Sequence, residues 1–298
     1  MKIVNGIFSG ILGFFLTVSL IILGGIITVE NTILNPAFVI SEMEKMDAYS
    51  IITNQVSLQL KGQLPTEIPY IEEMIDETIT ELEPWLREQA NLVIYDGIAY
   101  LKEEQELHVI IPLEEVRERI KENVQEFILE SLPPELAGVP QEMVEFFLSQ
   151  IYIEIDNQIP EKIEVNETLL GTEITAQLHQ AQQVVGYIEI GDIILISLIV
   201  LLVLIITLLQ RWRLKFIARY SGLPFIMAGV FTLIATFLAG NFISEVVPAE
   251  LPHEITALLP LLVGDFISPM RTYSIIILAM GIVLLVLSLI LKSSDDLS

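Results

Sequence analysis

Three histidines are the side chains best suited to metal binding or proton transfer, and they lie far apart in the sequence. They are His108, His179 and His253. None has a second ligand at metal-binding spacing. His253 precedes Glu254, but the second histidine of an H-E-x-x-H helix is missing. The pattern favours scattered structural or surface histidines over a metal centre.

Carboxylates are the most abundant reactive groups, and six of them gather in one short stretch. They are Glu72, Glu73, Asp76, Glu77, Glu81 and Glu83. On a helix, carboxylates four residues apart repel one another by about 0.2–0.5 kcal/mol per pair. A solvent-exposed acidic face explains this pattern, and weak binding of divalent cations is the alternative, because Ca²⁺ takes oxygen ligands. The D-x-[DN]-x-[DN]-G pattern of a calcium loop is absent.

Other common catalytic patterns are missing from the 298 residues. The chain has no cysteine, which excludes thiolate catalysis, disulfides and iron–sulfur clusters. It contains no G-x-S-x-G elbow and no Walker lysine. A formal net charge of −24 leaves no electrostatic footprint for nucleic acid. We therefore expect no catalytic residue, no cofactor and no nucleic-acid partner.

Hydrophobic residues make up 53% of the chain, and many of them concentrate in four uncharged segments. These segments are residues 7–29, 193–209, 223–243 and 274–291. A helix that spans a bilayer needs about 20 such residues. The first segment is longer than the apolar core of a cleavable signal peptide and no A-x-A site follows it, so we expect an uncleaved anchor. The absence of ionisable residues inside the segments argues against a stand-alone pump or proton relay.

Basic residues set the expected orientation of the four spans. They are Lys2, Arg211, Arg213, Lys215, Arg219 and Lys292. Four spans place all six on one side of the membrane, and the positive-inside rule makes that side cytoplasmic. We expect a multi-pass protein of the cell membrane with both termini in the cytoplasm.

Acidic residues concentrate in the long segment between the first two spans. Residues 30–190 contain 32 acidic and 8 basic residues and so carry the whole net charge of −24. We expect three regions: an N-terminal anchor (1–29), an acidic extracytoplasmic domain (30–190) and a three-helix membrane region (191–298). The last contains an extracytoplasmic loop at residues 244–273. Apolar residues at helical spacing in this loop predict an amphipathic helix on the outer leaflet, with packing against the acidic domain as the alternative, and Pro260 should kink or split this helix.

The acidic segment is periodic and predicts a folded, mainly α-helical domain. Asn35 and Pro36 are typical of a helix start, and the apolar spacing continues to residue 61. Pro84 should divide a second helical stretch near Glu83. Further helices are expected at 113–127, 143–151 and 172–209, the last with Gly186 and Gly191 as weak points. Residues 107–111 and 163–165 are strand candidates, so the fold class is mainly α with room for a small β-sheet.

Small residues at four-residue steps predict close helix packing in the membrane. They are Gly6 and Gly10 in the first span, and Ala228, Thr232, Thr236 and Gly240 in the third. Packing within one chain explains these faces, and formation of a homo-oligomer is the alternative.

Six residues that follow the first apolar segment form a pattern. They are Leu34, Asn35, Pro36, Phe38, Asp47 and Tyr49. Together with the order of the spans, this pattern resembles a loose group of uncharacterised bacterial integral membrane proteins. These have one N-terminal span, an extracytoplasmic region and C-terminal spans. The resemblance implies a bacterial envelope protein and brings no catalytic residue with it.

These observations lead to three functional hypotheses. The first is an envelope protein that presents an extracytoplasmic interaction, sensing or scaffolding domain. The second is an accessory subunit of a transporter or channel complex, and the third is a membrane hydrolase that uses carboxylates. The expected partners are the lipid bilayer and other membrane proteins or a second copy of the chain.

Overall fold

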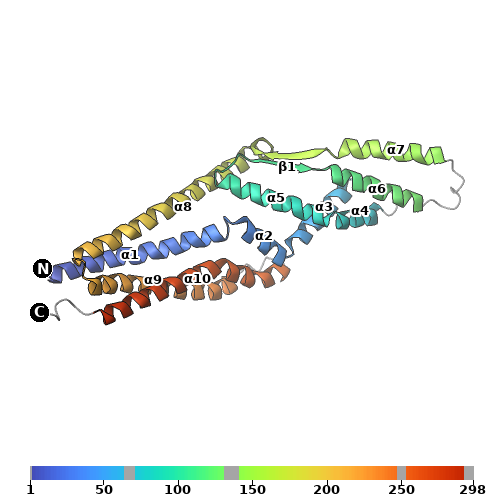
Figure 1. Ribbon diagram of the computed structural model, residues 1–298. Helices are drawn as coiled ribbons and strands as arrows, with labels where there is room; N and C mark the ends of the chain where they lie inside the picture. The colour runs from blue at the N-terminus through green and yellow to red at the C-terminus, as the bar shows by residue number, and fades with distance from the viewer. Residues whose placement is uncertain (1, 64–70, 131–140, 247–252, 292–298) are drawn as a thin grey trace. The chain divides into compact units, whose positions relative to one another are not determined.

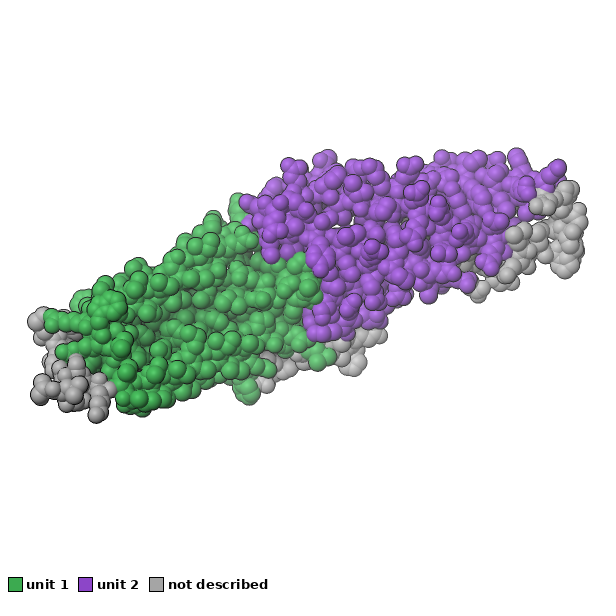
Figure 2. Space-filling view, viewed as in Figure 1, with its two compact units in different colours: residues 1–39, 183–298 green, residues 40–182 purple. Residues whose placement is uncertain are grey.

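The computed structural model describes residues 2–63, 71–130, 141–246 and 253–291 (Figure 1). This part of the chain is mostly helical, with a small two-stranded sheet. It divides into two units, which Figure 2 colours separately. The first unit comprises residues 1–39 and 183–298, and the second comprises residues 40–182.

Long apolar helices build the first unit. They are α1 (Lys2–Asn31), the second part of α8 (Glu167–Leu209), α9 (Leu214–Val246) and α10 (His253–Ile290). Each contains a stretch that is long and apolar enough to cross a membrane. The prediction of four potential membrane spans is therefore confirmed in length and composition.

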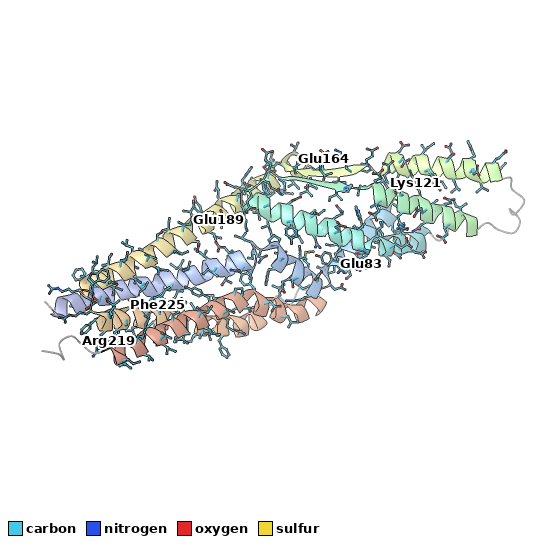
Figure 3. The ribbon with its side chains drawn as sticks, viewed as in Figure 1. Glu83, Lys121, Glu164, Glu189, Arg219 and Phe225 are labelled. Atoms are coloured by element: carbon cyan, nitrogen blue, oxygen red, sulfur yellow. The ribbon has the colours of Figure 1, made fainter. Side chains whose placement is uncertain are left out.

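The core of the first unit is apolar and draws on all four helices. Its members are Leu16, Leu20, Leu202, Ile206, Phe225, Ala228 and Ile277. Leu16 and Ile206 are completely buried, and Phe225 is labelled in Figure 3.

One end of this unit gathers segments that are far apart in the sequence. The first turns of α1 and α9 lie there with the last turn of α10 (Figure 1). In the connection between α8 and α9, Gln210 Nε2 donates a hydrogen bond to Ser9 Oγ on α1 at 3.0 Å. On α9, Gly222 lies close to the carbonyl oxygen of Gly281 on α10. Neighbouring helices run in opposite directions. This end of the bundle therefore holds the connection at residues 210–213, the start of α1 and the end of α10.

Shorter helices and a two-stranded sheet build the second unit. The helices are the second part of α2 (Pro36–Lys45), α3 (Ala48–Gln63), α4 (Ile71–Glu81), α5 (Glu83–Leu101), α6 (Glu114–Glu130), α7 (Gln141–Gln158) and the first part of α8. Strands β1 (His108–Pro112) and β2 (Lys162–Asn166) pair antiparallel, with Val109 opposite Val165. The two strand candidates of the sequence analysis are thus confirmed, and they pair with each other.

Two predicted helix boundaries are confirmed. The backbone N–H of Ala37 donates to Asn35 Oδ1 at 3.1 Å, so Asn35 caps α2 and Pro36 occupies its first position. The second helical stretch divides into α4 and α5 at Leu82, one residue before the expected point. Pro84 lies in the first turn of α5, where its missing N–H costs no intrahelical hydrogen bond.

The single helix expected over 36–61 is wrong, because the chain breaks into α2 and α3 at Met46–Asp47. Asp47 has φ +52°, a left-handed conformation that Asp tolerates better than most residues. The hydroxyl of Ser50 contacts Asp47 Oδ2 at 2.8 Å and stabilises this turn. The apolar periodicity continues through the break and therefore conceals it.

The segment at 244–273 also differs from the expected loop. Residues 247–252 lie outside the described residues, and helix α10 starts at His253 and continues to Ile290. Pro260 and Pro269 lie inside this helix and do not end it. Membrane helices tolerate proline where neighbouring helices and side chains satisfy the freed carbonyl groups.

Helix α8 has one non-helical residue, Gly171, with φ +76° and ψ 168°. From Thr172 to Leu209 the backbone is helical, including Gly186 and Gly191. The predicted helix over 172–209 is therefore confirmed, and neither glycine breaks it.

Candidate functional site

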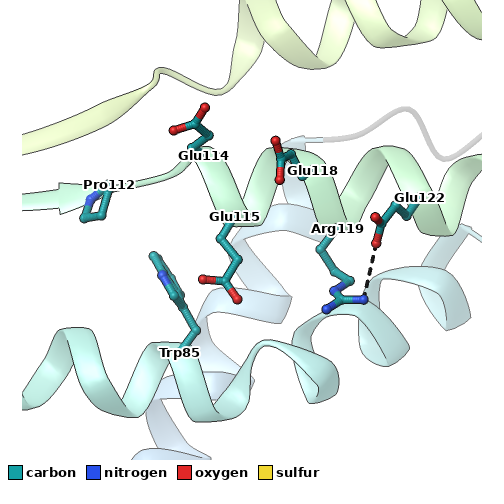
Figure 4. A pocket seen from close by; sticks show the side chains of 7 residues that line it. All are labelled: Trp85, Pro112, Glu114, Glu115, Glu118, Arg119 and Glu122. Carbon is teal, nitrogen blue, oxygen red and sulfur yellow. Dashed lines mark hydrogen bonds and ion pairs between the residues drawn. The ribbon is translucent and has the colours of Figure 1, made fainter.

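An open acidic pocket of about 510 Å³ lies between α5 and α6 in the second unit (Figure 4). It is lined by Trp85, Pro112, Glu114, Glu115, Glu118, Arg119 and Glu122. Pro112 ends strand β1, and the N–H of Leu113 donates to the carbonyl of Glu161 at 2.8 Å. This bond ties the start of α6 to the segment before β2.

Helical spacing places the four lining glutamates on two neighbouring faces of α6. Residues 114 and 118 are four apart and residues 115 and 122 are seven apart, so each pair lies on one face of α6. In Figure 4 the Glu115 side chain points toward α5, whereas the Glu114 and Glu118 side chains point to the other side of α6. Glu114 and Glu115 also lie in the first turn, where the helix dipole favours negative charge. All four glutamates are exposed to solvent.

Arg119 supplies the single positive charge among the lining residues. Its Nη1 lies 3.3 Å from Glu122 Oε2, and its Nε lies 3.7 Å from Glu81 Oε2 on α4. The opposite wall carries the indole of Trp85, which extends from α5 toward Pro112 and Glu115 in Figure 4. Carboxylates beside an aromatic face attract a positively charged group. The arrangement can hold an ammonium or guanidinium group from a partner.

The acidic stretch at 72–83 forms separate polar contacts. Ser57 Oγ and Lys61 Nζ donate to the two carboxylate oxygens of Asp76 at 2.7 and 2.8 Å. These bonds, from Lys61 first and Ser57 second, lower the pKa of Asp76. Glu83 pairs with Arg87 at 3.4 Å. The side chains of Glu72 and Glu73 lie outside the described residues.

The histidines lie on separate elements. His108 starts strand β1 opposite Asn166, and His179 on α8 lies 2.9 Å from Gln182 and 3.8 Å from Glu167. The side chain of His253 lies outside the described residues. Among the residues that the structure describes, no group of three or more histidine or carboxylate side chains is arranged to hold a metal ion.

A buried polar contact that the sequence did not reveal joins α5 to α8. The Tyr100 hydroxyl donates to Glu167 Oε1 at 2.9 Å, and Gln182 Nε2 donates to the Tyr100 carbonyl at 2.8 Å. Burial, with Glu167 nearby, raises the pKa of the Tyr100 phenol. These residues lie 67 and 82 positions apart, so no local spacing indicates the contact.

The basic residues that predict the orientation, where the structure describes their side chains, lie at the end of the first unit where α9 begins and α10 ends. Arg211 and Trp212 both adopt left-handed conformations, with φ +49° and +59°, in the tight connection between α8 and α9. Lys215 and Arg219 follow on the first turns of α9. The side chain of Lys2 and all of Lys292 lie outside the described residues.

Some of the predicted packing residues are buried and others are not. Ala228, Thr232 and Thr236 are at most 3% exposed. A Cβ on Gly6 would lie 3.9 Å from the Tyr220 hydroxyl, whereas Gly10 faces open space. The surroundings of Gly240 lie outside what the structure describes.

Close backbone contacts between α9 and α10 occur at glycines outside the predicted packing set. A Cβ on Gly229 of α9 would lie 2.8 Å from the backbone N of Leu278. A Cβ on Gly281 of α10 would lie 2.7 Å from the backbone N of Ile226. A Cβ on Gly222, seven residues before Gly229, would lie 3.1 Å from the Gly281 carbonyl oxygen. The seven-residue spacing of Gly222 and Gly229 was the sequence signal that could have indicated this close packing.

No protein family, curated protein or solved structure matches this chain.

Proposed function

We propose that this chain is an integral membrane protein that presents an acidic helical domain outside the cytoplasm to bind a positively charged partner protein. One observation carries the proposal: the chain separates into an apolar helical unit and a second unit that holds most of the acidic residues. The second unit also carries the acidic pocket beside Trp85.

The orientation is supported by where the basic residues lie. The described cations Arg211, Arg213, Lys215 and Arg219 lie at or next to the α8–α9 connection. Four antiparallel spans with this end in the cytoplasm leave the acidic unit on the opposite side. An acidic surface there repels anionic lipid head groups and remains available to a cationic partner.

The accessory-subunit alternative would need a free helix face suited to another membrane helix. Of the four potential spans, α8 is the least buried inside the molecule. Its apolar part, residues 193–209, is mainly Ile, Leu and Val, with Ser197 and Thr207 as its only small residues. Helix interfaces in membranes are enriched in small residues, so this composition favours contact with lipid.

Cysteine labelling tests the orientation in this cysteine-free chain. Gln105 and Trp212 are exposed, so Gln105→Cys and Trp212→Cys present accessible thiols. A cysteine at Ser221 would be a poor alternative to Trp212→Cys. Ser221 is only 4% exposed, so the reagent would not reach it on either side of the membrane. An impermeant thiol reagent should label Gln105→Cys in intact cells and spare Trp212→Cys until the cells are opened. The reverse pattern would contradict the proposal.

Charge removal in the pocket tests the interaction. The variant Glu115→Gln/Glu118→Gln removes two lining charges, and Glu103→Gln/Glu104→Gln removes two exposed charges from the same unit outside the pocket. Proteins that co-purify from native membranes should be recovered with the second variant and depleted with the first. Equal recovery with both would exclude the pocket as the binding surface.

A further inference from the structure

A second pocket, of about 310 Å³, lies between α9 and α10 in the first unit. It is lined by Lys215, Phe216, Arg219, Leu285, Ser288 and Leu289. Arg219 is labelled in Figure 3. The pocket lies at the end of the unit where α9 begins and α10 ends.

One wall of this pocket is cationic. Lys215 and Arg219 are four residues apart on α9, so their side chains lie on the same helix face. Neither forms an ion pair with any residue that the structure describes. Two like charges at this spacing repel each other, and an anion between them relieves that repulsion. Lys215 also lies in the first turn of α9, where the helix dipole favours a negative ligand.

The other wall is apolar. Leu285 and Leu289 come from α10, and Leu289 is 83% exposed on the outer surface of this potential span. The Ser288 hydroxyl donates to the Leu285 carbonyl at 2.7 Å, so its proton is already engaged within its own helix. A site for free phosphate would offer donors on every side, whereas cations facing leucines match a molecule with a charged head and a hydrocarbon chain.

We propose that this pocket binds an anionic phospholipid, with the phosphate between Lys215 and Arg219 and an acyl chain along Leu285 and Leu289. The inference rests on the proposed membrane insertion. Basic pockets between membrane helices on the cytoplasmic side are suited to anionic head groups. A volume near 310 Å³ accommodates a head group and leaves the chains in the bilayer.

Native mass spectrometry of the purified full chain in detergent tests the site, with phosphatidylglycerol and phosphatidylcholine of identical acyl chains as probes. The wild type should retain phosphatidylglycerol preferentially. Lys215→Gln/Arg219→Gln should weaken its retention about 25-fold, at roughly fivefold per cation removed. The matched control Arg211→Gln/Arg213→Gln removes two cations from the neighbouring connection, outside the pocket, and should retain the lipid.

The charge-conserving variant Lys215→Arg/Arg219→Lys guards against misfolding and should retain phosphatidylglycerol like the wild type. Equal loss in the pocket and control pairs would overturn the proposal in favour of diffuse electrostatic attraction. Displacement of the lipid by millimolar glycerol 3-phosphate would also overturn it, because the ligand would then be a soluble phosphate. Binding in detergent does not depend on orientation, so its failure is distinguishable from a reversed topology in the labelling experiment.

Discussion

The two units differ in the polar contacts that their side chains make. In the first unit, hydroxyl groups mostly turn back onto their own helix: Thr28 donates to the Gly24 carbonyl at 2.7 Å and Ser274 to the Met270 carbonyl at 2.6 Å. In the second unit, several polar side chains also bond to carboxylate or amide side chains on another helix. Ser57 on α3 donates to Asp76 on α4 at 2.7 Å.

This difference is the one expected if the first unit lies in lipid and the second in water. Helices in lipid gain no hydrophobic free energy by associating, so they need close contact between small residues. Gly229 and Gly281 provide that contact between α9 and α10. Helices in water can exchange hydrogen bonds with solvent, and polar pairs then select which helices meet. The chain therefore uses glycine in one unit and polar pairing in the other.

Each unit contains one of the two tryptophans, which allows the comparison to be tested unit by unit. A Trp212→Phe background leaves Trp85 as the reporter of the second unit. A Trp85→Phe background leaves Trp212 as the reporter of the first. Thermal unfolding of the full chain in detergent, followed by tryptophan fluorescence, then gives one transition per background.

The largest expected effect is at Tyr49. This side chain is 3% exposed, its hydroxyl bonds to Asn91 on α5, and Arg87 lies 5.0 Å from the ring centroid. Tyr49→Ala should cost the second unit about 3–5 kcal/mol, because it empties a buried aromatic site. Tyr49→Phe keeps the ring and should cost about 1 kcal/mol for the lost hydrogen bond.

The Trp85 transition should fall steeply for Tyr49→Ala and slightly for Tyr49→Phe, while the Trp212 transition should stay in place. A fall of equal size at both tryptophans would show that the two units unfold together. The contrast between them would then not extend to stability.

A smaller effect is expected at Gly229. The new Cβ in Gly229→Ala would meet the backbone of Leu278, which cannot rotate away, so we expect a loss of about 1–3 kcal/mol in the first unit. Gly264→Ala on α10 is the control, because no atom lies within 4 Å of the added Cβ. It should be neutral or stabilising by up to about 1 kcal/mol, from the better helix propensity of alanine. The midpoint of the Trp212 transition measures both, and indifference to Gly229→Ala would exclude close packing there.

The smallest effect depends on pH and concerns Asp76. Lys61 and Ser57 lower the pKa of this carboxyl in the folded state, so its stabilising contribution is present above the ordinary value of about 3.9. It is lost as the pH falls through the lower folded value, where the native carboxylate takes up a proton. Wild type should therefore melt above Asp76→Asn near pH 7, and the gap should close in strongly acidic buffer.

Glu77→Gln is the matched control for Asp76→Asn. It removes one negative charge from the neighbouring position on α4, which is exposed to solvent. The Trp85 transition, recorded from pH 7 downward, should separate the two variants. A gap between wild type and Asp76→Asn that persists at the lowest pH would point to a packing effect of the substitution.

Local signals predicted local structure well. Asn35 and Pro36 marked a helix start, and Pro84 marked the division between α4 and α5. The two strands were visible as short apolar stretches, but their pairing was not, because strand propensity contains no information about a partner some 50 residues away. The turn at Asp47 was missed because the apolar spacing continued across it.

The sites were harder to predict than the elements. The acidic pocket joins Trp85 to glutamates of α6, and only the packing of α5 against its neighbours brings them together. The sequence drew attention to the carboxylates at 72–83, whose density is greater but whose described members bond to separate partners. The second pocket, which we propose binds a phospholipid, likewise needs α10 to lie beside α9. Helical periodicity alone does not determine which helices are neighbours.

Gly171 lies between strand β2 and the helix over 172–209, and its backbone angles lie in a region that essentially only glycine occupies. Thr175 Oγ1 donates to the Glu167 carbonyl at 3.0 Å across this point, although residues eight apart in a straight helix lie about 12 Å apart along the axis. The chain therefore folds back at Gly171 before the helix begins. In genetic terms, every amino acid reached from a glycine codon by one base change carries a Cβ. We expect selection to admit only silent substitutions at this codon.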